Sequence, residues 1–446
     1  MNRLARFTVC CLFLVGLSSV HGQEKSRGIP ETDEGVPGAG PFRRTESFRK
    51  SWTTRREQFL KTTAADKGSL VFFGDSITQG WGARLPKLFP GAKTANRGIG
   101  GDTTRGMLYR FKEDVIDLDP TGVVMLMGTN DLADGASKED IVGNVKLMLL
   151  MLKAKQPGLP VILCTVFPSN ASKDRPPEKI KELNEALLAA VKGDSVVTVV
   201  DTWSMFADAE GNAPVAEFPD LLHLNDAGYE KWAKALRPVL ETHMLIPVEA
   251  DTFTPEEGFV SLFNGRDLTG WGVQATPEET LKQRENVLKK NPNGPVWPIF
   301  KESKAFDGQI ASDDGRYVVR NGRIIVMTPA EGRRIQTLST TKAFPKDFTL
   351  RLEFRATPNA DSGVFLRKPQ LQCRDFIVAG PYKNLKSYKP QEWNVLEVVA
   401  KGAAAKCTCN GEVLEEAFKL PETGPIGLEG DRGQMEYRRI RIKTEG

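Results

Sequence analysis

The chain has 446 residues, of which 40% are hydrophobic, and its formal net charge is +4. This length is sufficient for two or three domains, and the hydrophobic fraction is ordinary for a globular protein. Because acidic and basic residues nearly balance and are interspersed, the composition argues against a nucleic-acid-binding protein, and we expect no nucleic acid partner.

The first 22 residues resemble a secretory signal peptide. Arg3 and Arg6 precede an apolar stretch over residues 7–20, and a small residue, Gly22, stands at the expected cleavage site. A membrane anchor is the alternative, but the apolar stretch is short for a span. We expect a secreted or periplasmic protein without a stable membrane anchor after cleavage. Residues 23–45 are rich in Gly, Pro and charge and are expected to form a flexible linker.

Helices and strands alternate through a first domain that we assign to residues 46–246. A helical pattern comes first, and short apolar runs then predict five strands, over residues 70–73, 94–96, 123–127, 161–166 and 196–200. Further helical patterns cover residues 103–116, 138–155, 177–192 and 226–243. This alternation predicts an α/β fold with a doubly wound parallel sheet of flavodoxin-like strand order.

A polar linker is expected at residues 247–257, and strand signals dominate the second domain, residues 258–446. Turn residues separate these strands at Asn321-Gly322 and Asn410-Gly411. The pattern predicts an all-β, two-sheet sandwich. Each half is long enough for its own core and the linker offers few residues to hold them together, so we expect two independently folding units.

The first predicted strand of the α/β domain runs directly into Gly74-Asp75-Ser76. A serine in this turn lies at the carboxyl end of a strand, where α/β folds place their ligands. Ser76 could instead merely cap the next helix. The decisive observation is that partners for a nucleophilic serine follow three other predicted strands.

Two of these partners are candidate oxyanion donors. Gly101 lies in a glycine-rich turn, Gly98-Ile99-Gly100-Gly101, whose backbone N–H could face a developing negative charge. Asn130 follows the third strand in Gly128-Thr129-Asn130 and could donate from its side chain. Alone, such an asparagine is usually a structural turn residue.

Asp220 and His223 complete the set after the fifth strand. With this spacing, a carboxylate can bind one imidazole nitrogen while the other faces the serine. His223 is therefore the candidate general base and Asp220 its orienting partner, although His223 could also be a core residue. His243 ends an amphipathic helix, where a cation favourable to the helix dipole is an adequate explanation.

These residues resemble the four blocks of the SGNH branch of the GDSL esterases and lipases. The blocks are Gly74-Asp75-Ser76, Gly101, Asn130 and Asp220-x-x-His223, and their context is similar to that of the α subunits of platelet-activating factor acetylhydrolase. The resemblance implies a Ser-Asp-His triad of Ser76, Asp220 and His223. It also implies oxyanion donors at Ser76, Gly101 and Asn130, with no metal and no cofactor.

The second domain resembles the 3-keto-disaccharide hydrolase family, through residues 258–271, 361–367 and 424–428, Glu392-Trp393-Asn394 and Asn410-Gly411. The resemblance implies a concanavalin-like jelly roll that acts on or binds sugars. Asp361, Arg367 and Gln372 are the candidate substrate-binding residues, and an ordinary salt bridge and hydrogen bond on a strand face are the alternative.

Four cysteines remain after signal cleavage. Cys164 falls in an apolar strand pattern, whereas Cys407 and Cys409 share one face of a strand. A disulfide from one of these two to Cys373 is compatible with an exported protein.

The combined expectation is an exported serine esterase that removes acyl groups, of which acetyl is the first candidate, from carbohydrate. Its partner would be an acylated carbohydrate or a small ester. The alternative is a keto-sugar glycoside hydrolase or glycan-binding protein with an accessory esterase domain.

Overall fold

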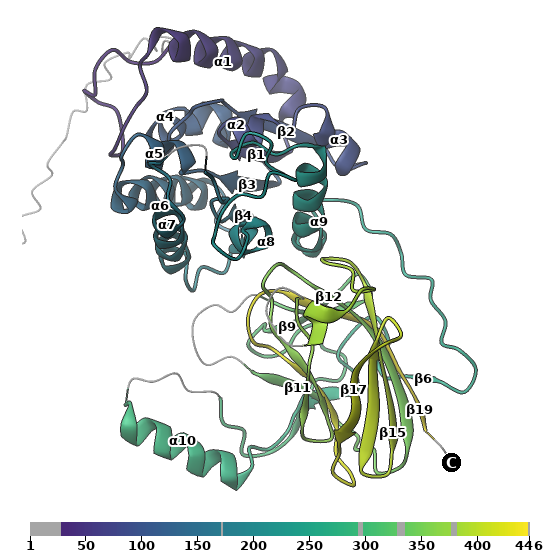
Figure 1. The fold of residues 1–446 in the computed structure, drawn as a ribbon. Helices are drawn as coiled ribbons and strands as arrows, with labels where there is room; N and C mark the ends of the chain where they lie inside the picture. Colours follow the sequence, from purple (N-terminus) through teal and green to yellow (C-terminus); the bar gives the residue numbers. More distant parts are fainter. Residues whose placement is uncertain (1–27, 171–172, 293–297, 328–334, 376–380, 445–446) are drawn as a thin grey trace, which may run out of the picture.

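The structure is a computed structural model that describes residues 28–170, 173–292, 298–327, 335–375 and 381–444. The expected signal peptide lies outside the described residues. Figure 1 shows an α/β domain followed by an all-β domain, with an extended segment of chain running between them along one side of the molecule. Among the described residues, no helix has both the length and the apolar character that crossing a membrane requires.

Five parallel strands form the sheet of the first domain, in the order β2-β1-β3-β4-β5. They are β1 Leu70–Gly74, β2 Thr94–Gly98, β3 Gly122–Leu126, β4 Val161–Cys164 and β5 Val197–Val200. Every residue of β1, β3 and β4 is buried, as expected for strands covered on both faces. The flavodoxin-like order predicted from the sequence is confirmed.

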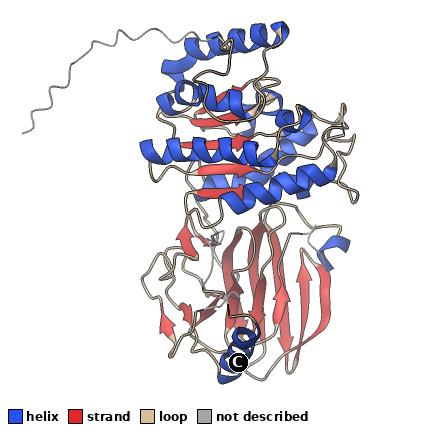
Figure 2. Cartoon of the chain, turned by 90° about the vertical axis from the view of Figure 1, so that its left-hand side faces the viewer, coloured by secondary structure: helices blue, strands red, loops and turns tan. Residues whose placement is uncertain are grey.

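Helices cover both faces of this sheet, as Figure 2 shows. Successive residues of β1 point to opposite faces, so Val71 and Phe73 pack beneath one helix layer and Leu70 and Phe72 beneath the other. The first layer contains α4 Thr104–Asp114, α6 Lys138–Lys155 and α7 Pro177–Ala190. The second contains α3 Arg84–Leu88, α8 Thr202–Phe206 and α9 Asp226–Thr242. The long helices match their predicted ranges, whereas short helices such as α3 and α8 were not predicted because they span too few residues to show a period.

The segment before the first domain is packed on it. Ile29, Val36 and Phe42 are buried in a cluster with Phe48 and Trp52 of α1 Glu46–Asp66. This corrects the expectation of a flexible linker for the described part of residues 23–45. Isolated apolar residues without periodicity gave no sign of the packing, because each one anchors a loop rather than a helix or strand.

Two antiparallel sheets form the second domain, as a jelly-roll sandwich requires. One sheet has the order β17-β16-β15-β12-β19-β10-β9, with β6 paired to β19, and the other β14-β13-β18-β11-β7-β8. The first sheet contains β6 Val260–Ser261, β9 Tyr317–Arg320, β10 Arg323–Val326, β12 Phe348–Ala356, β15 Asn394–Lys401, β16 Ala404–Cys409, β17 Glu412–Lys419 and β19 Met435–Thr444. The second contains β7 Trp271–Val273, β8 Lys304–Ala305, β11 Thr337–Thr340, β13 Gly363–Leu366, β14 Gln370–Gln372 and β18 Ile426–Glu429. Helix α10 Glu278–Lys290 has no buried residue.

A buried ionic cluster joins the two domains. Glu241, near the end of α9, accepts hydrogen bonds at 2.8 Å from Arg323 and 2.6 Å from Arg355 of the sandwich. Glu436 binds the same two guanidinium groups, at 3.2 and 2.6 Å. Arg320 donates to the carbonyl of Thr242 at 2.7 Å and thereby caps the last turn of α9.

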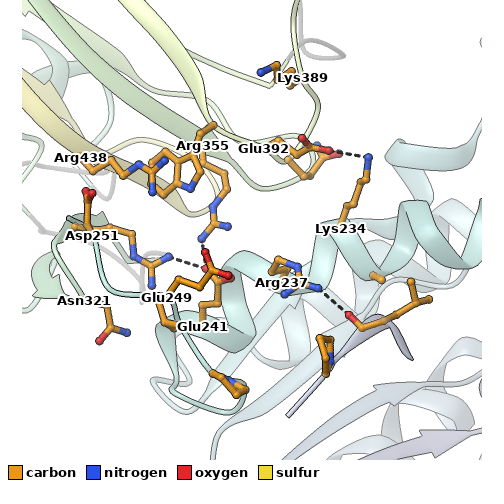
Figure 3. Close-up of a pocket in the computed structure, with 18 of the residues that line it drawn as sticks. Lys234, Arg237, Glu241, Glu249, Asp251, Asn321, Arg355, Lys389, Glu392 and Arg438 are labelled. Carbon is orange, nitrogen blue, oxygen red and sulfur yellow. Dashed lines mark hydrogen bonds and ion pairs between the residues drawn. The ribbon is translucent and has the colours of Figure 1, made fainter. Parts of the chain in front are cut away.

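The cluster borders a cavity of about 830 Å³ between the domains. Figure 3 shows charged side chains from α9, from the segment after it and from the sandwich converging around this space. The segment itself is also fixed, because Asp251 binds Arg439 and Glu256 binds Arg441. Side chains of α9 and of the segment after it thus join the halves, although the linker was expected to offer few residues for this purpose. Independent folding of the two halves stays a prediction.

His243 is half-buried at the C-terminal end of α9, and its imidazole is neutral near pH 7. Burial, with the charge of Arg320 nearby, lowers its pKa to about 4, and its Nε2 lies 3.1 Å from the Thr198 hydroxyl. The dipole explanation offered from the sequence is therefore wrong for this residue.

The four described cysteines, Cys164, Cys373, Cys407 and Cys409, are all buried free thiols. The disulfide that the sequence left open is not formed. Burial raises the pKa of Cys164, Cys407 and Cys409 to about 12, so these thiols stay protonated.

Candidate active site

Ser76 is placed by a sharp turn between β1 and α2 Ser76–Gln79. A Cβ at Gly74 would lie 2.3 Å from the Leu126 carbonyl oxygen, so the strand can end here only with glycine. The buried Asp75 carboxylate accepts a hydrogen bond from the Ile77 amide at 2.9 Å and caps α2. The serine thus stands at the carboxyl end of a central strand, half-buried.

The predicted triad is assembled in hydrogen-bonding geometry. His223 Nε2 lies 2.9 Å from Ser76 Oγ, and His223 Nδ1 lies 2.6 Å from Asp220 Oδ2. Asp220 Oδ1 also accepts from the backbone amide of His223 at 2.7 Å. One carboxylate therefore fixes both the backbone and the imidazole orientation of the histidine.

Asp220 is ionised at all ordinary pH values. Partial burial acts to raise its pKa, but hydrogen bonds from the His223 side chain and the His223 and Leu222 amides outweigh burial and lower the pKa to about 2. A carboxylate that stays charged favours the His223 tautomer with the proton on Nδ1, which leaves Nε2 free to accept the Ser76 proton.

The loop that carries Asp220 and His223 is held by a second loop. Leu221 has a φ of 62°, in the left-handed region. Its carbonyl accepts hydrogen bonds at 3.0 Å from both the Asn170 amide and the Ser169 hydroxyl. At the other end, the Asn225 side chain caps α9 by accepting from the Gly228 amide at 3.0 Å. The turn between these anchors presents His223 to the serine.

Both predicted oxyanion donors lie at the same edge of the sheet. Gly101 has a φ of 79°, a conformation that favours glycine, and a Cβ there would lie 3.1 Å from Arg43 Nη1. Asn130, in α5 Thr129–Ala133, is buried and donates from Nδ2 to the Asp102 carbonyl at 3.0 Å. A Cβ at neighbouring Gly100 would lie 3.7 Å from the Ser76 Cβ, so this glycine turn adjoins the serine.

Buried charges that sequence reasoning did not identify support this turn. Asp102 pairs with Arg110 at 2.7 Å, and Arg110 also donates to the Gly74 carbonyl at 3.1 Å, so one guanidinium ties the glycine turn to the end of β1. Asp131 accepts from the Thr104 amide at 3.0 Å, and burial raises its pKa to about 7. In the sequence, the only feature that marked Asp102, Arg110 and Asp131 was their position near the Gly101 and Asn130 motifs.

Arg43 is a further residue that sequence reasoning missed. It comes from the N-terminal segment expected to be a linker, and its guanidinium donates to the Gly101 carbonyl at 2.9 Å. No periodicity or motif marked it, because it lies in an irregular stretch rich in glycine, proline and charged residues.

The structure brings together two of the three candidate residues of the second domain. Asp361 pairs with Arg374 at 2.9 Å, and Arg374 also binds the Gln372 side chain. Glu429 lies in the same neighbourhood, and burial followed by the charges of Asp431 and Asp361 raises its pKa to about 7.

Arg367 is not part of this group. It follows the far end of β13, is buried, and donates to the backbone carbonyls of Phe344, Lys346 and Pro421 at 2.7, 2.7 and 2.8 Å. These bonds occupy its guanidinium with loop carbonyls, so its placement indicates a structural role rather than the substrate contact we expected. Within the described residues, no group of three or more His, Cys, Asp or Glu side chains is placed to share a metal ion.

Comparison with known proteins matches both halves of the chain. Residues 72–231 match the GDSL-like Lipase/Acylhydrolase family, and residues 258–443 match the 3-keto-alpha-glucoside-1,2-lyase-like domain. Platelet-activating factor acetylhydrolase IB subunit alpha2 of Homo sapiens is 27% identical over 213 residues, which are 46% of this chain and 87% of that protein.

Solved structures of acylhydrolases and of glycosyl hydrolases are both similar to parts of the chain. A GDSL-like lipase of Bacteroides thetaiotaomicron is 28% identical and has a TM-score of 0.38, with 42% of this chain and 97% of that chain covered. An acetyl xylan esterase of Geobacillus stearothermophilus is 22% identical with a TM-score of 0.33, covering 42% and 100% of the two chains. By the two family matches, the chain carries a GDSL-like Lipase/Acylhydrolase domain at residues 72–231 and a 3-keto-alpha-glucoside-1,2-lyase-like domain at residues 258–443.

Proposed function

We propose that this protein is an exported serine esterase that hydrolyses acyl esters, in the first place acetyl esters, of carbohydrate. The observation that carries the proposal is the relay in which Ser76 Oγ lies 2.9 Å from His223 Nε2 and His223 Nδ1 lies 2.6 Å from Asp220. This arrangement can turn a hydroxyl into a nucleophile without any further group.

The reaction has two halves. Ser76 Oγ attacks the ester carbonyl carbon while its proton passes to His223 Nε2, and the resulting oxyanion faces the amides of Ser76 and Gly101 and the Asn130 side chain. As the C–O bond breaks, His223 gives the proton to the leaving alcohol. Water, deprotonated by His223, then attacks the acyl-serine, and Ser76 takes the proton back.

Two features support a carbohydrate ester as substrate. The side chains of Asp220 and His223 are 58% and 42% exposed, so the triad is open to a bulky alcohol group rather than enclosed for a small one. A hollow of about 500 Å³ is lined by Gly100 together with Thr45, Ser47 and Ser51, whose side chains carry hydroxyl groups. Its size and hydroxyl groups suit a sugar ring.

The test is acetate release from acetylated polysaccharides and from nitrophenyl acetate by the full chain and by Ser76→Ala. We expect the full chain to act on both, and we expect Ser76→Ala to lose activity by several orders of magnitude on both. Hydrolysis of the small ester without acetate release from any polysaccharide would contradict the carbohydrate assignment, and an active Ser76→Ala would contradict the serine mechanism.

We also propose an independent activity on a 3-keto-glucoside for the second domain. It is supported by the matched family and by Glu429, a carboxyl with a pKa of about 7 beside Asp361 and Gln370, because such a group can donate or accept a proton near neutral pH. Glu429→Gln should abolish cleavage of a 3-keto-disaccharide and leave ester hydrolysis unchanged. Cleavage at the rate of the unaltered protein would remove Glu429 from the mechanism.

A further inference from the structure

The N-terminal segment crosses the start of α4 next to the candidate active site. The Asn144 side chain accepts a hydrogen bond from the Ala39 amide at 3.0 Å and donates one to the Ala39 carbonyl at 2.9 Å. Thr103 donates its hydroxyl to the Pro41 carbonyl at 2.7 Å, and Arg105 donates to the Gly40 carbonyl at 3.1 Å. We refer to residues 39–43 as the strap.

Phe42 fixes the end of the strap. Its ring is buried and contacts the rings of Trp52 and Tyr109, with centroids 6.5 and 5.8 Å apart. Because the ring of Phe42 is held in a packed cluster, the next side chain, Arg43, starts from a defined position and reaches over the glycine turn.

The Arg43 guanidinium lies between the two predicted oxyanion residues. Nη1 donates to the Gly101 carbonyl at 2.9 Å and lies 3.5 Å from Asn130 Oδ1. Nε and Nη2 bind the two oxygens of Asp134 at 2.6 and 2.8 Å. This two-point pairing with a carboxylate holds the plane of the guanidinium, so that Nη1 is directed to the other two residues.

The position of Arg43 determines which way the Asn130 amide points. Asn130 Nδ2 faces the Asp102 carbonyl at 3.0 Å, and Oδ1 faces the guanidinium. A flipped amide would place Oδ1 against the Asp102 carbonyl oxygen and the NH₂ group against a cation, two repulsive contacts. The favoured orientation keeps one N–H of Nδ2 with Asp102 and leaves the second for an oxyanion.

We propose that Arg43 is a positioning residue for ester hydrolysis and acts by holding Gly101 and Asn130 in the orientation that stabilises the oxyanion. The proposal rests on the proposed esterase function. It explains why a segment outside the α/β fold is bound so closely to the β2–α4 turn. Arg43 does not touch Ser76, His223 or Asp220 in any described hydrogen bond, so its effect is indirect.

The experiment compares Arg43→Ala with Arg49→Ala. Arg49 is a matched control because its side chain is similarly exposed, 25% against 27%, and it pairs with one carboxylate, Glu31, without reaching Gly101 or Asn130. With nitrophenyl acetate, we expect Arg43→Ala to lower kcat about 10- to 100-fold with KM changed less than threefold, because disturbing an oxyanion site affects the transition state. Arg49→Ala should stay within about twofold of the unaltered protein.

Two further measurements separate positioning from general support of the fold. Guanidinium ion added at millimolar concentration should restore part of the rate to Arg43→Ala and none to Asn130→Ala. In the Asn130→Ala background, Arg43→Ala should cost much less than in the unaltered protein, since both changes remove the same interaction. If Arg43→Ala does not fold, Arg43→Lys serves, because lysine can pair with Asp134 but cannot also bridge Gly101 and Asn130.

The proposal is overturned by a kcat within twofold for Arg43→Ala or Arg43→Lys, by an equal loss in Arg49→Ala, or by full additivity with Asn130→Ala. Ser76→Ala is measured in the same assay. If Ser76→Ala remains active, the esterase mechanism fails, whereas an inactive Ser76→Ala beside an unaffected Arg43→Ala overturns only the role of Arg43.

Discussion

At the scale of single residues, Asn130 is the clearest test of the oxyanion site, because its side chain is the only predicted donor that a substitution can remove. Asn130→Ala should lower kcat on nitrophenyl acetate by about 10²-fold or more, since the loss of one such donor weakens binding of the transition state. Steady-state kinetics that showed a changed KM and an unaltered kcat would make Asn130 a structural residue of α5.

Asp220 sets the pH dependence expected of the triad. With its pKa lowered to about 2, the Asp220 carboxylate is charged from mildly acidic to alkaline pH. The proposed mechanism requires His223 Nε2 to be unprotonated, because this atom accepts the Ser76 proton. Activity should therefore fall on the acid side, and a pH–rate profile of kcat/KM that stays flat down to pH ~4 would contradict the role of His223.

Replacement of the same carboxylate tests its orienting role. Asp220→Asn keeps the shape of the side chain but no longer favours the proton on Nδ1, so kcat should drop by about 10²- to 10⁴-fold with little change in KM. Stopped or continuous assays of nitrophenyl acetate hydrolysis measure this directly. A variant that retained at least half of the turnover would show that the 2.6 Å contact does not serve catalysis.

At the scale of elements, the catalytic turn shows what sequence can reveal. The strand ending in Gly74, the serine after it and the three partner positions were all predicted, because each depends on local pattern and on the common edge of a parallel sheet. Arg43, Asp102 and Arg110 were not predicted, since their roles depend on contacts across the fold. The packing of residues 28–45 on the first domain was not predicted for the same reason.

The end of α9 provides a prediction about stability. The pKa of half-buried His243 is lowered to about 4 from 6.5 by partial burial and by the charge of Arg320. As the pH falls from 6.5 to 4, His243 therefore becomes protonated in the unfolded chain but not in the folded chain. The free energy of unfolding decreases over this pH range, by about 3 kcal/mol in total at pH ~4. His243→Gln removes this pH-dependent loss of stability, and above pH 7 the loss is absent from both proteins.

The check is urea unfolding of the protein and of His243→Gln at pH 7 and at pH 4. The difference in unfolding free energy between the two proteins should shift by about 3 kcal/mol in favour of His243→Gln at the lower pH. An equal pH dependence in both proteins would mean that His243 is protonated within the folded domain.

At the scale of the whole molecule, the cluster around Glu241 joins the domains. Glu241→Ala leaves two buried guanidinium groups with Glu436 as their remaining carboxylate partner, and we expect a loss of about 3–5 kcal/mol. Lys234→Ala is the matched control, because the exposed pair of Lys234 with Glu392, 2.7 Å apart, also crosses the interface. Its loss should cost less than about 1 kcal/mol.

Thermal unfolding followed by calorimetry measures both variants. Glu241→Ala should lower the unfolding midpoint well below that of Lys234→Ala and separate the unfolding of the two domains. Equal unfolding midpoints in the two variants would contradict a stabilising role of the Glu241 cluster at the interface. They would instead favour the independent folding of the two halves that was expected from the sequence. The pattern of helix and strand signals could predict the two folds but not this interface, which depends on contacts of α9 side chains with β10, β12 and β19.

The most direct test of the whole account is to identify the nucleophile by chemical trapping. Treatment with a fluorophosphonate, followed by digestion and mass spectrometry, should place the phosphonyl group on the peptide that contains Ser76. The same treatment should leave Ser76→Ala and His223→Ala unlabelled, with ester hydrolysis lost in parallel. Labelling of a different residue, or undiminished hydrolysis after Ser76 is fully modified, would contradict the account.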